Sequence, residues 1–72
     1  MNNARRKQIQ QAIRKIEDLV QNILEDEQEA YENMPESLQE SENGVNSVDA
    51  QENLDAAIET LEEAISYLEE ID

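Results

Sequence analysis

The chain has 72 residues, five basic and nineteen acidic side chains, a formal net charge of −14, and neither cysteine nor histidine. This composition excludes disulfides, the usual zinc sites and histidine-dependent catalysis, and the negative charge argues against direct binding to nucleic acid or anionic lipid. A domain of this length buries only about 60% of the surface that its unfolded chain exposes, so a monomer would be marginally stable.

The charges are separated along the chain. All five cations lie within the first fifteen residues, and every residue from Ile16 onward is acidic or uncharged. Cations at a helix N-terminus and carboxylates at a helix C-terminus each oppose the helix dipole. Two antiparallel helices would bring the basic start of the first beside the acidic end of the second, so each end would neutralise the other.

Apolar residues in the first segment recur at steps of three and four, which predicts a helix over about residues 3–33. The main row that we predict to pack inward is Ile9, Ile13, Ile16, Val20, Ile23, Ala30 and Met34. A second row, at Ala12, Leu19, Leu24 and Tyr31, widens this stripe. A stripe of this width is typical of a bundle helix rather than of a two-stranded coiled coil.

The only proline and the only glycine, Pro35 and Gly44, lie in the next segment, so we predict a turn over about residues 34–45. Pro35 favours the start of one short helical turn that ends near Gln39. Gly44 could adopt a positive φ, and the second long helix would then begin near Asn46 or Ser47.

The second helix is predicted over about residues 46–71. Its apolar row is Leu54, Ile58, Leu61, Ile65 and Leu68, flanked by Ala50, Ala57, Ala64 and Ile71. The sequence therefore predicts one all-α domain over residues 1–72, an antiparallel helical hairpin. Because a hairpin cannot cover stripes this wide, we expect a homodimer that forms a four-helix bundle. A higher oligomer, or a hairpin completed by a different protein, remains an alternative.

Acidic side chains dominate the outer face of the second helix. They are Glu52, Asp55, Glu59, Glu62 and Glu69, with Glu63 and Glu70 beside them. Nineteen acids along a hairpin of about 40 Å give one negative charge per ~2 Å, near the ~1.7 Å of duplex DNA. This face either solubilises the protein or mimics DNA toward a basic protein groove.

A second group of candidate partner-binding residues lies near the turn: Glu27, Tyr31, Pro35, Glu36 and Leu38. Glu27 interrupts the apolar row between Ile23 and Ala30. Drift of the seam around the helix would turn Glu27 partly to water and bring Leu24 and Tyr31 inward. Alternatively, Glu27 is part of a partner surface, and the turn is either a cap over the bundle end or a contact surface.

No constellation indicates an enzyme. A carboxylate active site needs an enclosed apolar pocket that raises the pKa of one carboxyl group. A hairpin whose only aromatic residues are two tyrosines has too few large side chains to line such a pocket. A di-metal site in a helical bundle needs histidine, and the oxygen-rich loop of an EF-hand is missing. We therefore predict no catalytic, cofactor-binding or metal-binding residues.

The turn region, Tyr31-Glu32-Asn33-Met34-Pro35-Glu36-Ser37-Leu38-Gln39 followed by Ser41-Glu42-Asn43-Gly44, resembles a family of small acidic helical proteins of phages, prophages and mobile elements of Gram-positive bacteria. In that family the turn reads roughly Asn-Leu-Pro-Glu-Ser-Leu-Gln, so Met34 replaces the usual leucine. The resemblance covers most of the chain, but only the turn is specific. It implies an accessory role in a phage or mobile element and transfers no active-site residues, because the family has no settled biochemical function.

These observations predict a non-enzymatic, protein-binding accessory factor that acts as an inhibitor or decoy of phage or mobile-element type. Its acidic surface would bind a host nucleic-acid-binding or defence protein. The alternative is a structural or assembly protein whose hairpin completes a helical complex or holds a basic client. With no apolar run of eighteen residues and a polar start, we expect a cytoplasmic protein without a membrane span or a signal peptide.

Overall fold

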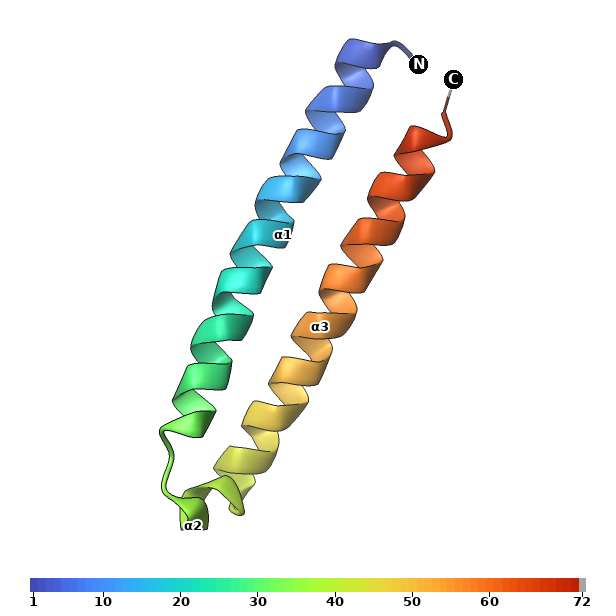
Figure 1. Cartoon of the computed structure of the whole chain (residues 1–72). Coiled ribbons are helices and arrows are strands. Elements are labelled where there is room, and N and C mark those ends of the chain that lie inside the picture. Colours follow the sequence, from blue (N-terminus) through green and yellow to red (C-terminus); the bar gives the residue numbers. More distant parts are fainter. Residues whose placement is uncertain (72) are drawn as a thin grey trace.

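The fold consists of two long helices, α1 (Asn3–Glu32) and α3 (Glu42–Glu69), joined by a turn that contains the one-turn helix α2 (Glu36–Gln39). It is taken from a computed structural model that describes residues 1–71. Figure 1 shows α1 and α3 side by side and running in opposite directions. The Cα atoms span 54 × 15 × 11 Å. The described residues contain no strand, so the predicted all-α class is confirmed.

The N-terminal end of α1 lies beside the C-terminal end of α3 (Figure 1). Asn2 caps α1, because its side-chain Oδ1 accepts a hydrogen bond from the backbone N–H of Arg5 at 2.8 Å. The first turn of α1 contains no acidic residue, and the last turn of α3 contains no basic residue. The basic start of α1 and the acidic end of α3 therefore each oppose the dipole of their own helix. Because these two ends lie side by side (Figure 1), their opposite charges are brought toward each other.

The turn between the long helices begins where Pro35 follows α1. Pro35 adopts a φ of −57°, and its carbonyl oxygen accepts hydrogen bonds from the N–H groups of Leu38 at 2.8 Å and Gln39 at 3.1 Å. The Gln39 side chain returns to α1, because its Nε2 donates to the carbonyl oxygen of Tyr31 at 2.9 Å. The Ser41 hydroxyl donates to the carbonyl oxygen of Leu38. The short helical turn that the sequence predicts after Pro35 is therefore present.

The start of the second long helix was predicted wrongly. Helix α3 begins at Glu42, with Ser41 as its N-cap, rather than near Asn46 or Ser47. Gly44 lies inside this helix and has no positive φ. The physical reason for a glycine here is space, since a Cβ at position 44 would lie 2.6 Å from the Cα of Gln39. Gly44 therefore permits close packing of α3 against α2, and the chain turns before it rather than at it.

The face of each long helix that its neighbour covers follows a seven-residue repeat. On α1 and the residues after it, the less exposed positions are Arg6, Gln10, Ile13, Glu17, Val20, Leu24, Glu27, Tyr31 and Met34. On α3 they include Gly44, Ser47, Gln51, Leu54, Ile58, Leu61, Ile65 and Leu68. Leu24 and Ile65 are the most deeply buried apolar residues, at 3% and 6% exposure. The core is therefore a narrow seam with polar residues among its members.

The prediction that the main apolar row of α1 packs inward was partly wrong. Ile9, Ile16 and Ile23, which were expected to pack inward, are 40%, 50% and 47% exposed, and Ala30 is exposed as well. Leu24, from the second row, is buried. The apolar stripe on α1 is wider than one neighbouring helix can cover. Helix α3 covers the row that contains Leu24, and the row one residue earlier is left on the surface.

Candidate protein-binding surface

The seven acidic residues predicted to form an outer face are all exposed. We define the acidic row as Glu52, Asp55, Glu59, Glu62 and Glu69, to which Glu63 and Glu70 lie adjacent. The helical period of α3 aligns the row, because its members follow steps of three and four residues, with Ser66 interrupting the series. The row therefore forms a negatively charged stripe along α3 that is interrupted at Ser66.

The charge density along the molecule is lower than the sequence predicted. The expected length of about 40 Å was too short, since the Cα atoms span 54 Å. The eighteen acids among residues 1–71 over 54 Å correspond to one per about 3 Å, compared with ~1.7 Å in duplex DNA. A single chain is therefore a weaker electrostatic mimic of DNA than predicted, and two copies side by side would double the density.

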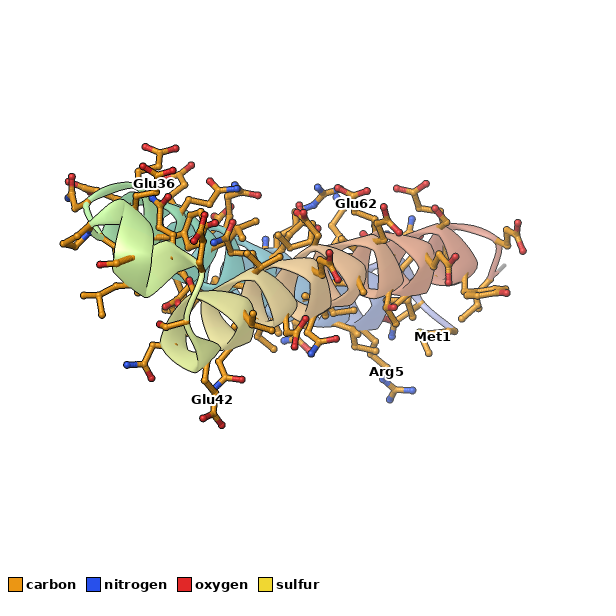
Figure 2. The ribbon with its side chains drawn as sticks, turned by 90° about the horizontal axis from the view of Figure 1, so that it is seen from below. Met1, Arg5, Glu36, Glu42 and Glu62 are labelled. Atoms are coloured by element: carbon orange, nitrogen blue, oxygen red, sulfur yellow. The ribbon has the colours of Figure 1, made fainter. Side chains whose placement is uncertain are left out.

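The five candidate residues near the turn do not form one surface. Pro35, Glu36 and Leu38 are exposed, and Leu38 keeps 46% of its surface accessible. Glu27 and Tyr31 are half-buried and belong to the face that α3 covers. Figure 2 shows Glu36 on the same side of the molecule as Glu62, so this side carries acidic side chains at the turn as well as on α3.

Leu24 is buried, and Glu27 and Tyr31 are both half-buried on the face that α3 covers. Leu24 and Tyr31 therefore lie inward as seam drift predicts, but Glu27 shares their face while Ile23 and Ala30 are exposed. The burial of Glu27 does not single it out as a contact for a partner.

Polar residues at the interhelical seam were not anticipated. Arg6, Gln10 and Glu17 occupy the same repeat as Ile13 and are half-buried. Among the described residues, Arg6 Nε and Glu17 Oε2 are buried atoms without a hydrogen-bond partner. Gln10 and Glu17 directly follow the apolar residues Ile9 and Ile16, which the hydrophobic pattern favours as the inward residues. These polar residues could have been identified only by knowing which side of α1 faces α3.

A second exposed surface lies on α1. Ile9, Ile16, Leu19 and Ile23 are all at least 40% exposed, and the smaller Ala12 among them is also exposed. Ala12 and Leu19 of the second row are exposed, as is Ala57 on α3, whereas Ala50 and Ala64 are half-buried. Clustered apolar residues on the surface of a small protein commonly mark a binding surface.

Residues 1–71 contain no detectable pocket, and no three acidic side chains among them are placed to share a metal ion. Neither long helix has a stretch apolar enough to cross a lipid bilayer within this part of the chain. The two exposed stripes, one acidic and one apolar, are therefore the features that the structure offers for binding.

Comparison of the chain with protein-family models, with curated proteins and with solved structures finds no match in any of the three.

Proposed function

We propose that this chain is a non-enzymatic accessory protein that binds a basic partner protein through the acidic row of α3. The observation that supports the proposal most is the alignment of exposed carboxylates along one side of α3 without an intervening cation. A stripe of this charge attracts a basic groove and accelerates association by electrostatic steering. The chemistry fits a nucleic-acid-binding protein, because its groove is built to neutralise a regular series of negative charges.

We also propose that the chain acts as a homodimer in which two antiparallel hairpins form a four-helix bundle. The exposed residues Ile9, Ile16, Leu19 and Ile23 support this step, because water contacts all of them in the single chain. Two copies side by side would also double the charge per unit length. The dimer would therefore approach the charge density of duplex DNA more closely than one chain does. An inhibitor or decoy from a phage or mobile element, acting on a host defence protein, is one context in which such a protein would work.

The test is capture of binding proteins from a Gram-positive bacterial lysate at about 50 mM and about 500 mM salt. The immobilised protein should retain a nuclease or other DNA-binding protein at low salt and release it at high salt. Duplex DNA added to the lysate should compete for the same partner. Retention that duplex DNA does not reduce would contradict decoy action.

A pair of matched variants separates the acidic row from net charge. The first carries Glu52→Gln, Glu59→Gln, Glu62→Gln and Glu69→Gln, and the second carries Glu25→Gln, Glu29→Gln, Glu32→Gln and Glu40→Gln. Each set removes four charges from exposed positions. The first should lose the partner, whereas the second should retain most of it. Equal losses would show that net charge alone is responsible.

A structural or assembly role is the second candidate, and the exposed apolar stripe on α1 favours it. A protein that completes a larger helical complex would be captured through Ile16 and Leu19 rather than through carboxylates. Its association would resist 500 mM salt and would be weakened by Leu19→Gln. The same capture experiment therefore distinguishes the two roles.

A further inference from the structure

One side of α1 carries an apolar stripe that ends in a cation at one end and an acid at the other. We call it the outer face of α1 and define it as Arg5, Ile9, Ala12, Ile16, Leu19, Ile23 and Asp26. These residues follow steps of three and four, so they lie on one side of the helix. Every one of them is exposed. Along the helix the face is therefore positively charged at Arg5, apolar in the middle and negatively charged at Asp26.

The sequence of α1 is close to symmetric in hydropathy and reversed in charge about Ile16. Positions whose numbers sum to 32 pair Ile9 with Ile23, Ala12 with Val20, and Ile13 with Leu19. The same rule pairs every cation of the chain with an acid: Arg5 with Glu27, Arg6 with Asp26, Lys7 with Glu25, Arg14 with Asp18, and Lys15 with Glu17. Gln10 and Gln11 pair with Asn22 and Gln21. A helix with this pattern is complementary to its own copy turned end for end.

The pairing of Gln8 with Leu24 is the one mismatch of polarity between residues 5 and 27. Leu24 is the most buried apolar residue of the structure and belongs to the seam between α1 and α3. Its apolar character is therefore explained by contact with α3. The symmetric pattern is therefore broken only at the position that also packs against α3.

We infer that the occupant of the outer face of α1 is the same face of a second copy, packed antiparallel about a two-fold axis at Ile16. Ile16 then meets Ile16, Ile9 meets Ile23, and Ala12 approaches Leu19. At both ends of the contact, Arg5 of one copy lies near Asp26 of the other. A parallel arrangement would instead place Arg5 against Arg5 and Asp26 against Asp26, so charge selects the antiparallel one.

Helix α3 can take part in the same contact. Ala57 and Ala64 each lie one residue before the seam residues Ile58 and Ile65, as Ile16 lies one residue before Glu17. Equivalent flanks of two antiparallel helices lie on the same side of the pair, so these alanines share a side with the outer face of α1. Their small side chains allow close approach of a second pair of helices. The proposed contact from Arg5 to Asp26 spans about 32 Å of helix, and the Cα atoms extend 15 Å across, so its footprint is roughly 500 Å² per partner, at the low end of specific interfaces.

The acidic row remains accessible in this dimer. Figure 2 shows Arg5 and Glu62 pointing to opposite sides of the molecule. Arg5 lies seven and fourteen residues before Ala12 and Leu19, which places all three on one side of α1. Self-association through the outer face therefore leaves the row that contains Glu62 free for another partner.

This inference rests on the homodimer of the proposed function and assigns its contact face and register. Sedimentation equilibrium at about 100 μM should give twice the chain mass of 8.3 kDa. A mass of 8.3 kDa would overturn both the homodimer and the register, and a different protein would then be the occupant of the face. A dimer whose contacts differ from those below would overturn the register alone.

Single cysteines test the register, because the chain has no cysteine of its own. Under mild oxidation Ile16→Cys should form a disulfide-linked dimer by itself, since the axis brings position 16 of both copies together. Ile9→Cys alone should stay unlinked, and a mixture of Ile9→Cys with Ile23→Cys should form linked heterodimers. The exposed control Glu59→Cys should not link. Linkage of Ile9→Cys alone as efficiently as Ile16→Cys would indicate a parallel dimer and overturn the register, as would the absence of linkage of Ile16→Cys.

Charge reversal tests the same register without oxidation. Arg5→Glu and Asp26→Arg should each weaken self-association by roughly tenfold, because each places two like-charged pairs in the dimer. A one-to-one mixture of the two variants should restore the affinity, since both pairs become attractive again in the heterodimer. The Arg5→Glu change puts an acid in the first turn of α1, which favours the helix, so unfolding would not explain the loss. Failure of the mixture to recover affinity would overturn the register.

Discussion

Gly44 of α3 lies against the main chain of Gln39, so close that a Cβ at position 44 would overlap the carbonyl group of Gln39 and lie 2.6 Å from its Cα. Gly44 is buried, and the overlapping atoms belong to the backbone, which cannot rotate away as a side chain could. The contact fixes how α3 leaves the turn. The chain has no other glycine, so this position is the one at which a side chain has been excluded.

Gly44→Ala should therefore lower the free energy of unfolding by about 1–3 kcal/mol, the usual cost of overpacking. An alanine inside a helix without steric conflict would instead stabilise it by roughly 0.5–1 kcal/mol relative to glycine. The two explanations predict opposite signs, and urea unfolding followed by circular dichroism distinguishes them. The neighbouring exposed position supplies the control, since Asn43→Ala should be neutral or slightly stabilising.

The hydrogen bond from Gln39 Nε2 to the carbonyl oxygen of Tyr31 gives a second prediction. Gln39→Met keeps the approximate length of the side chain and removes the donor, so it should cost about 0.5–1.5 kcal/mol. In a domain of this size the melting temperature should fall by several degrees. Gln28→Met, at an exposed position of α1, is the matched control. Equal melting temperatures for Gln39→Met and the wild-type chain would show that water replaces the bond at no cost.

The sequence predicted both long helices and the turn at Pro35, because apolar periodicity and the effect of proline are local properties. It did not predict the start of α3, since the same glycine that indicates a turn also serves a tight contact. In that contact Gly44 packs against the backbone of Gln39, and the spacing of apolar residues does not reveal it.

The side of α1 that faces α3 was also not predictable from the sequence. Ile16 and Glu17 are neighbours, and hydropathy alone favours Ile16 as the inward residue. In the structure Glu17 is the less exposed of the two. Two rows of α1 are apolar, one containing Ile16 and the other containing Leu24. Which of them α3 covers depends on where the turn places α3. The exposed acidic row was predictable, because its steps of three and four residues need no knowledge of the neighbouring helix.

Leu24 and Ile16 should respond differently to truncation. Leu24→Ala should lower the free energy of unfolding by about 2–5 kcal/mol at every protein concentration, because it opens a cavity in the seam. Ile16→Ala should stay within about 0.5 kcal/mol in dilute solution, where half of its surface is already in water. At concentrations where copies associate, it should lower the melting temperature. Thermal melts over a concentration series measure both effects. A large loss for Ile16→Ala at the lowest concentration would contradict the exposure seen here.

The N-cap of α1 gives a fourth prediction. Asn2→Ala removes the acceptor for the Arg5 N–H and should cost about 0.5–2 kcal/mol. Asn2→Asp keeps an acceptor and adds a negative charge at a terminus surrounded by cations, so it should be neutral or stabilising. Melting curves of the two variants provide the comparison. If both variants lose the same stability, the capping bond contributes nothing and the start of the helix is held by other contacts.

Removing charges from the acidic row should not weaken the fold. Glu59 and Glu62 are three residues apart on an exposed face, and like charges at this spacing destabilise a helix by about 0.2–0.5 kcal/mol per pair. The variant with Glu52→Gln, Glu59→Gln, Glu62→Gln and Glu69→Gln should therefore be at least as stable as the wild-type chain at low salt. Because salt screens the repulsion, the difference should shrink toward zero at about 500 mM. Urea unfolding at both salt concentrations measures it. A variant clearly less stable than the wild-type chain would mean that these carboxylates contribute to the fold, and the loss of a partner in the capture experiment could then follow from unfolding.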